Sequence, residues 1–252
     1  MVFGPVGIRC PECAGSPTGT KKTVQRVRTA GDRAPAGIVT MVLIGANVIV
    51  YLAEIASGSS WQALSGNVYV QGALYGPAVA HGDWWRLITN AFLHAGLIHL
   101  FFNMLMLWWL GRSLEALIGP GRYLGIYFTS ALAGSAGALL LSPTTPTVGA
   151  SGAVFGILGA GLVLERRKIY VFGGSALGLV VINLILSFTL SNISIGGHLG
   201  GLAAGVACML LIMRFGRSAP LLSREGIPVI VSFIGVGIAS VVIAYVRVRG
   251  YA

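Results

Sequence analysis

Four polar side chains within apolar stretches of this 252-residue chain could act together in catalysis. Ser151 lies in a Gly-Ala-Ser-Gly sequence at residues 149–152, immediately before an apolar run. His99 and Asn103 are four residues apart, so on a helix they share one face. His198 precedes the glycines of another apolar run. A serine that meets a histidine at close range predicts a nucleophile with its general base.

In this interpretation Ser151 attacks a carbonyl carbon, while His198 removes its proton and later delivers that proton to the leaving amine. The developing oxyanion needs donors, which the Ser151 backbone N–H and the side chains of His99 and Asn103 supply. No carboxylate of the sequence is placed to orient His198, so the residues indicate a Ser–His dyad and not a triad. Ala153 replaces the second glycine of a G-x-S-x-G elbow, which argues against a hydrolase of that fold.

The elements that must position these residues are membrane helices. Only 10% of the chain is charged and 55% is hydrophobic, whereas soluble domains carry about 25% charged residues. We predict an all-α, polytopic transmembrane helix bundle with a six-helix core and one C-terminal helix. Seven apolar runs are long enough, or nearly so, to span a bilayer: 37–56, 88–110, 123–141, 151–164, 169–190, 196–213 and 228–246. The predicted divisions are a polar, basic cytosolic tail (1–35), the transmembrane core (36–215), and a linker with the seventh helix (216–252).

The net charge of +10 is interpreted as a topology signal, not as a nucleic-acid surface, because basic residues cluster in the tail and in short connections. This pattern predicts a multi-pass protein of the cell membrane (plasma or inner) with a cytosolic N-terminus and a site that opens to the outer side. Ser151, His99 and His198 then lie near the outer portions of helices that run inward, with His99 somewhat further along its helix. The run 151–164 spans roughly 21 Å at ~1.5 Å per residue, so Ser151 is expected below the outer surface.

Small residues indicate which helices meet. Gly152 and Gly156 in the fourth run, and Gly201 and Gly205 in the sixth, are spaced four apart, which lets helix backbones approach closely. His198 shares a face with the glycines of the sixth run and is expected to point into this contact. On their own the glycines would mean only tight packing.

Two further segments each allow two interpretations. The outer connection 57–87 carries Trp85 and Arg86 and is predicted to lie partly in the membrane interface, with an ordinary extracellular loop as the alternative. Cys10 and Cys13 form a CxxC pair without the second pair that a four-ligand zinc site needs. They are either half of a zinc ribbon or free thiols in a flexible tail.

These motifs resemble the rhomboid intramembrane serine proteases. The resemblance covers roughly residues 37–215, and its HxxxN, GxSG and histidine–glycine motifs stand in family order. It implies a Ser–His dyad that uses no metal or cofactor, acts in membrane lipid and cleaves other transmembrane proteins within or near their membrane-spanning segment. Ser151 matches the nucleophile, His198 the general base, and His99 with Asn103 the oxyanion-stabilising pair.

Gly149, Gly152 and Phe155 match supporting positions around that site. Many rhomboids have a tyrosine at the position of Phe155, and a phenylalanine keeps the stacking on the histidine but loses the hydroxyl. His94 matches a common histidine of the family, and we interpret it as structural. The alternatives are a non-catalytic binding protein of the same fold, a metal or haem protein that uses the histidines, and a transporter. A transporter is the least favoured, because the sequence shows no evident inverted repeat.

Overall fold

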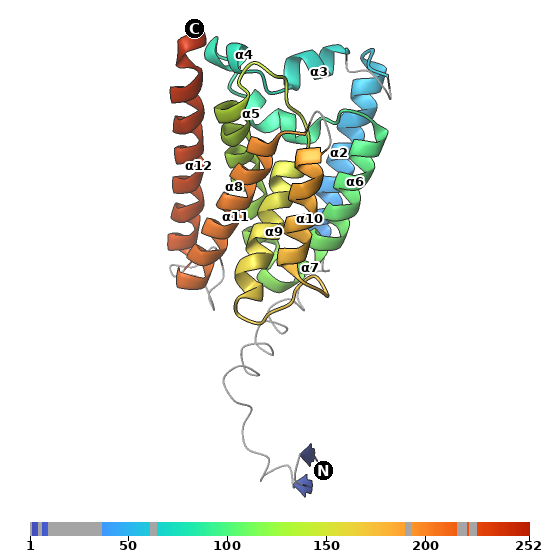
Figure 1. The fold of residues 1–252 in the computed structure, drawn as a ribbon, viewed down its shortest axis with the longest axis vertical. Coiled ribbons are helices and arrows are strands. Elements are labelled where there is room, and N and C mark those ends of the chain that lie inside the picture. The colour runs from blue at the N-terminus through green and yellow to red at the C-terminus, as the bar shows by residue number, and fades with distance from the viewer. Residues whose placement is uncertain are drawn as a thin grey trace.

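The computed structural model describes residues 2–4, 7–9, 37–60, 65–189, 193–215, 221 and 226–252. Apart from a short hairpin of β1 (Val2–Gly4) and β2 (Gly7–Arg9), the described elements are helices that run side by side (Figure 1). Their longest segments are α2 (Ile38–Ala56), α6 (Leu97–Met106) continued by η2 (Leu107–Gly111) and α7 (Arg112–Ile118), α8 (Pro120–Leu141), α9 (Ser151–Glu165), α10 (Ala176–Thr189), α11 (Ile195–Phe215) and α12 (Ile227–Val248), followed by η3 (Arg249–Tyr251). The predicted all-α polytopic bundle is confirmed.

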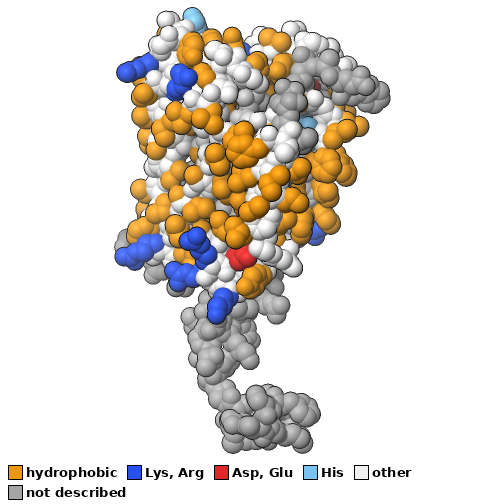
Figure 2. All heavy atoms as spheres, viewed as in Figure 1, with side chains coloured by type: hydrophobic (Ala, Val, Ile, Leu, Met, Phe, Trp, Pro, Cys, Tyr) orange, Lys and Arg blue, Asp and Glu red, His pale blue; other side chains and the backbone are white. Residues whose placement is uncertain are grey.

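The surface of the bundle is that of a membrane protein. By length and composition, five of its described helical segments could cross a bilayer, and α9 and α10 are shorter apolar helices. Large hydrophobic side chains such as Ile49, Phe101 and Ile238 are more than half exposed. Figure 2 shows apolar side chains across the middle of one face, with basic side chains toward the two ends. The chain is therefore a multi-pass membrane protein.

Helix α9 lies at the centre of the bundle, and nearly every residue from 153 to 164 is buried. Its glycines permit the predicted close contact with α11. A Cβ atom added at Gly201 would collide with the carbonyl oxygen of Gly152, and one added at Gly205 would collide with that of Gly156. Side chains larger than hydrogen would therefore force the two helices apart.

The predicted second helix, 88–110, is wrong at both ends. Residues Arg86–Thr89 form the short helix α5 and Asn90–Phe92 form a 3-10 turn, η1. The chain then leaves helical geometry, with Gly96 at φ 145°, before α6 begins at Leu97. His99 is therefore the third residue of its helix, and the expectation that it lies further along is also wrong. The predicted fifth helix likewise begins late, at Ala176, because the chain turns at Gly173 with φ 74°.

The predicted outer connection 57–87 contains the short helices α3 (Asn67–Gly72) and α4 (Gly76–Ala80) in addition to the start of α5. Arg86 organises it: one guanidinium nitrogen donates to the carbonyls of Val70 (2.7 Å) and Ala73 (2.8 Å), and another pairs with Asp83 at 2.9 Å. Arg86 is buried by protein and only 7% exposed. The placement of this segment in the membrane interface stays a prediction, as does the three-part division of the chain.

At the opposite end, Glu115 of α7 holds the start of α2. Its carboxylate accepts hydrogen bonds from the backbone N–H of Val39 (3.0 Å) and Thr40 (2.9 Å) and from the Thr40 hydroxyl (2.7 Å). The first N–H groups of a helix have no partner within the helix, and an anion there is stabilised by the helix dipole.

Cys10 and Cys13, which the sequence offers as half of a zinc ribbon or as free thiols, lie outside the described residues.

Candidate active site

Ser151 is the first residue of α9, and the turn before it is fixed by bonds to distant segments. Gly149 has φ 129°, a conformation that L side chains rarely adopt, and its N–H donates to the Asn90 carbonyl at 2.9 Å. Leu74 and Thr147 exchange two backbone hydrogen bonds of 3.0 and 2.9 Å. Ser151 is half-buried, whereas the helix beyond it is buried. The turn therefore presents this serine at the accessible end of a buried helix.

His198 lies beside the same helix. The Phe155 ring stacks on the His198 imidazole, with centroids 4.0 Å apart and planes 17° apart. Ser151 and Phe155 are one turn apart on α9, so they share the face of the helix on which the imidazole stacks. The stacking predicted for Phe155 is thus present. The described hydrogen bonds do not include one between Ser151 Oγ and His198, and catalytic contacts are often long in enzymes without substrate.

His99 approaches Ser151 from the other side. A Cβ atom added at Gly149 would lie 2.9 Å from His99 Nε2 and 3.6 Å from Ser151 Oγ, so the imidazole and the hydroxyl flank the same glycine. The backbone N–H of Ala95 donates to His99 Nδ1 at 3.3 Å. A backbone N–H can only donate, so Nδ1 accepts and the neutral ring carries its proton on Nε2. The nitrogen beside Gly149 is therefore a hydrogen-bond donor.

Asn103 is tied to His99 rather than to the serine. Its side-chain amide donates to the His99 carbonyl at 2.9 Å, one turn back on α6, and the residue is buried. The amide has a second N–H, for which no partner is described. The structure thus brings Ser151, His198 and His99 together and places Asn103 directly behind His99.

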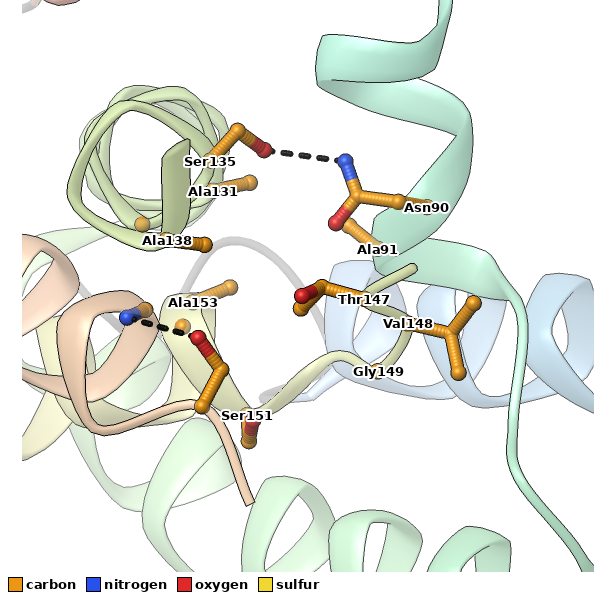
Figure 3. A pocket seen from close by; sticks show the side chains of 14 residues that line it. Asn90, Ala91, Ala131, Ser135, Ala138, Thr147, Val148, Gly149, Ser151 and Ala153 are labelled. Carbon is orange, nitrogen blue, oxygen red and sulfur yellow. Dashed lines mark hydrogen bonds between the residues drawn. The ribbon is translucent and has the colours of Figure 1, made fainter. Parts of the chain in front are cut away.

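A small cavity adjoins Ser151 (Figure 3). Its volume of about 20 Å³ is enough for one water molecule, and its lining includes the polar residues Asn90, Ser135 and Ser194. The Asn90 amide donates to Ser135 Oγ at 2.9 Å, a bond that joins the segment before α6 to α8. Asn90 and Ser135 could not be predicted from the sequence, since both are single polar residues in apolar runs and belong to no spacing motif.

Two other polar residues near the histidines were also missed. Ser187 of α10 has its hydroxyl 2.6 Å from His198 Nδ1, and Glu54 of α2 accepts the backbone N–H of His94 at 3.1 Å. His94 is fully buried and its ring meets that of His99 edge-on, with centroids 5.2 Å apart. Within the described residues, no group of three His, Cys, Asp or Glu side chains is placed to hold a metal ion.

The fold and its polar site define a multi-pass membrane protein with a serine and two histidines close together among its helices. Comparison with known proteins identifies its family. Residues 81–215 match the Rhomboid domain family model. The chain belongs to the rhomboid family.

The relatives include proteases and a protein named as inactive. The chain is 39% identical over 171 residues to the Rhomboid protease GluP of Bacillus subtilis (strain 168), which covers 66% of this chain and 33% of GluP. It is 35% identical over 145 residues to the Putative rhomboid protease YdcA of the same organism, covering 56% of this chain and 73% of YdcA. It is also 32% identical over 141 residues to the Inactive RHOMBOID-like protein 8 of Arabidopsis thaliana, covering 54% of this chain and 36% of that protein. The matched segment therefore spans about a third of GluP.

Proposed function

We propose that this chain is an intramembrane serine endopeptidase that cleaves transmembrane protein substrates within or near their membrane-spanning segment. The observation that supports it most is the position of Ser151. Its hydroxyl and the donor nitrogen of His99 lie beside the same glycine, Gly149, and it is one turn along α9 from Phe155, whose ring stacks on His198. Membership of a family that contains proteases supports the same reaction class.

The proposed mechanism assigns one role to each group. Ser151 Oγ attacks the carbonyl carbon of the scissile peptide bond, and His198 takes the hydroxyl proton as the new C–O bond forms. The oxyanion accepts hydrogen bonds from His99 Nε2–H, from Asn103 and from the Ser151 backbone N–H. The N-cap of α9 is Ala150, which provides no side-chain cap, and N–H groups in the first turn of a helix have no helical partner.

Breakdown of the tetrahedral intermediate completes the cycle. The C–N bond breaks, and His198 gives its proton to the leaving amine. A water molecule then attacks the acyl-enzyme, with His198 again as the base, and the cavity beside Ser151 has room for such a water. These steps need no metal or cofactor. Supporting roles fall to Gly149, Gly152 and Phe155, which let the elements approach or stack on the imidazole.

The proposal extends to substrate and orientation. A peptide bond within a membrane helix is hydrogen-bonded internally, so the substrate must unwind locally before it reaches Ser151, and small, helix-destabilising residues are expected near the cleavage site. The basic residues favour a cytosolic N-terminus in a cell membrane, with the active site open to the outer side.

Labelling with a fluorophosphonate tests the assignment. Wild-type protein in detergent is compared with Ser151→Ala, with His198→Ala, and with Ser240→Ala, a matched control that removes a buried serine hydroxyl of α12 bonded only to its own helix. We expect label on the wild type and on the control, and none on the other two variants. Cleavage of a single-pass substrate in liposomes should follow the same pattern.

The second candidate is a non-catalytic member of the family. Two observations favour it: none of the hydrogen bonds described for this structure joins Ser151 to His198, and the chain is similar to a relative named as inactive. A folded wild type that neither takes the label nor cleaves any of a panel of transmembrane substrates would establish this candidate instead.

A further inference from the structure

One serine outside the proposed dyad makes a direct bond to its histidine. Ser187 of α10 is only 3% exposed, and its Oγ lies 2.6 Å from His198 Nδ1 and 2.7 Å from the Asn183 carbonyl oxygen. The other buried residues of α10, Ala176 and Val180, lie in the first part of the helix. Ser187 is therefore the point at which the last turns of α10 meet the site.

The single hydroxyl proton of Ser187 decides which group donates in its bonds to Asn183 and His198. A carbonyl oxygen only accepts, so the single hydroxyl proton of Ser187 must lie toward Asn183 for two oxygens to approach to 2.7 Å. The Ser187 oxygen then has only lone pairs to offer His198. Nδ1 of His198 must therefore carry a proton and donate it, which leaves Nε2 of the neutral ring as the acceptor.

We infer that Ser187 is a positioning residue that holds His198 in the tautomer able to accept the proton of Ser151. The inference rests on the proposed function, and it adds a third side chain to the proposed Ser151–His198 dyad. In Ser-His-Asp enzymes a carboxylate bonded to Nδ1 has this orienting role, and a wrong tautomer costs about 10⁴ in kcat. A neutral hydroxyl orients the ring without adding a negative charge, so a smaller effect is expected here.

A purely structural role for Ser187 is the competing explanation, because its hydroxyl also fastens α10 to the bundle. Nitrogen-15 NMR of the full chain in detergent, labelled at histidine, separates the two. The chain has four histidines, and His198→Gln identifies the relevant signals. We expect the wild type to show a protonated Nδ1 and an unprotonated Nε2 at His198. The opposite tautomer in the wild type would overturn the inference without any variant of Ser187.

Three substitutions then test the cause. Ser187→Thr keeps the hydroxyl, and Ser187→Val has nearly the shape of the threonine variant but no hydroxyl. Ser187→Ala removes the hydroxyl without adding bulk. Thr189→Ala is the matched control, because its hydroxyl bonds only within α10, to the carbonyls of Ile185 (3.0 Å) and Leu186 (3.3 Å). We expect the Nδ1–H tautomer to persist in the threonine variant and the control, and to be lost in the other two. An unchanged tautomer in the alanine and valine variants refutes the inference.

Kinetics provide the second readout. Loss of the hydroxyl should lower kcat by about 10- to 100-fold, the range expected when a buried donor loses its partner, with KM unchanged. Ser187→Thr should restore most of kcat. If Ser187→Ala and Ser187→Val cleave substrate at the wild-type rate while Ser151→Ala is inactive, the protease assignment stands and the role of Ser187 is refuted. If the wild type does not cleave, the proposed function fails, and the tautomer measurement still decides what Ser187 does to His198.

Discussion

Gly149→Ala is the substitution that tests the geometry most directly. Its φ of 129° costs an L residue about 1–3 kcal/mol, and the added Cβ would lie 2.7 Å from His99 Cε1. Ordinary contact begins near 3.4 Å, so the imidazole must retreat by about 0.7 Å. A misplacement of about 1 Å can cost 10²-fold in rate. We therefore expect kcat/KM for a transmembrane substrate to fall by about 10- to 100-fold.

The matched control for this substitution is Gly82→Ala. Gly82 has a similar φ of 111° but nothing within 4 Å of an added Cβ, so it carries the backbone cost without the displaced ring. Both variants should lose similar free energy of unfolding, measured by thermal unfolding in detergent, and only Gly149→Ala should lose activity. In a His99→Ala background the ring is absent, so Gly149→Ala should cause little further loss. An equal loss of activity in both glycine variants, or full additivity with His99→Ala, would refute the assigned geometry.

Three further predictions concern the residues around the site. Glu115→Ala removes three hydrogen bonds at the start of α2 and should lower the free energy of unfolding by about 2–3 kcal/mol, while activity per folded molecule stays within twofold. Phe155→Leu removes the ring stacked on His198, an interaction of about 0.5–1.5 kcal/mol, and should lower kcat several-fold, whereas Phe155→Tyr should not. Arg86→Lys cannot reproduce the guanidinium bonds to two carbonyls and a carboxylate, so limited proteolysis should cut between α3 and α5 faster than in the wild type.

The parts of the fold that could be predicted are those with local boundaries. Helix α9 ends one residue from its predicted end, because a turn rich in proline and threonine precedes it and a run of charges follows it. The contact of α9 with α11 was predictable because glycines four residues apart have a direct steric meaning. The stack of Phe155 on His198 came from the resemblance and is present in the structure.

What could not be predicted depends on backbone geometry and on partners far away in the chain. Residues 88–96 include Ile88, Phe92 and Leu93 and follow directly into the apolar α6, so the sequence pattern does not mark Gly96 as the point after which the helix begins. The sequence also does not mark residues 107–111 as the π-helix η2. This segment joins α6 to α7, so that one continuous helical segment extends to Ile118. Asn90 donates to Ser135 and accepts from the Gly149 N–H only because α8 and the turn before α9 fold against it.

The two histidines near Ser151 are the same side chain in two opposite tautomers, and in the proposed mechanism this difference lets one serve as the acid–base group and the other as the oxyanion donor. A free imidazole exchanges its proton between its nitrogens, so residue type alone assigns neither role. At His99 the Ala95 N–H donates to Nδ1, which leaves the proton on Nε2 and makes that atom a donor. At His198 Nδ1 donates to Ser187, which leaves Nε2 an acceptor. In the proposed mechanism the two roles are therefore set by the partners of the two Nδ1 atoms, one on the segment before α6 and the other on α10.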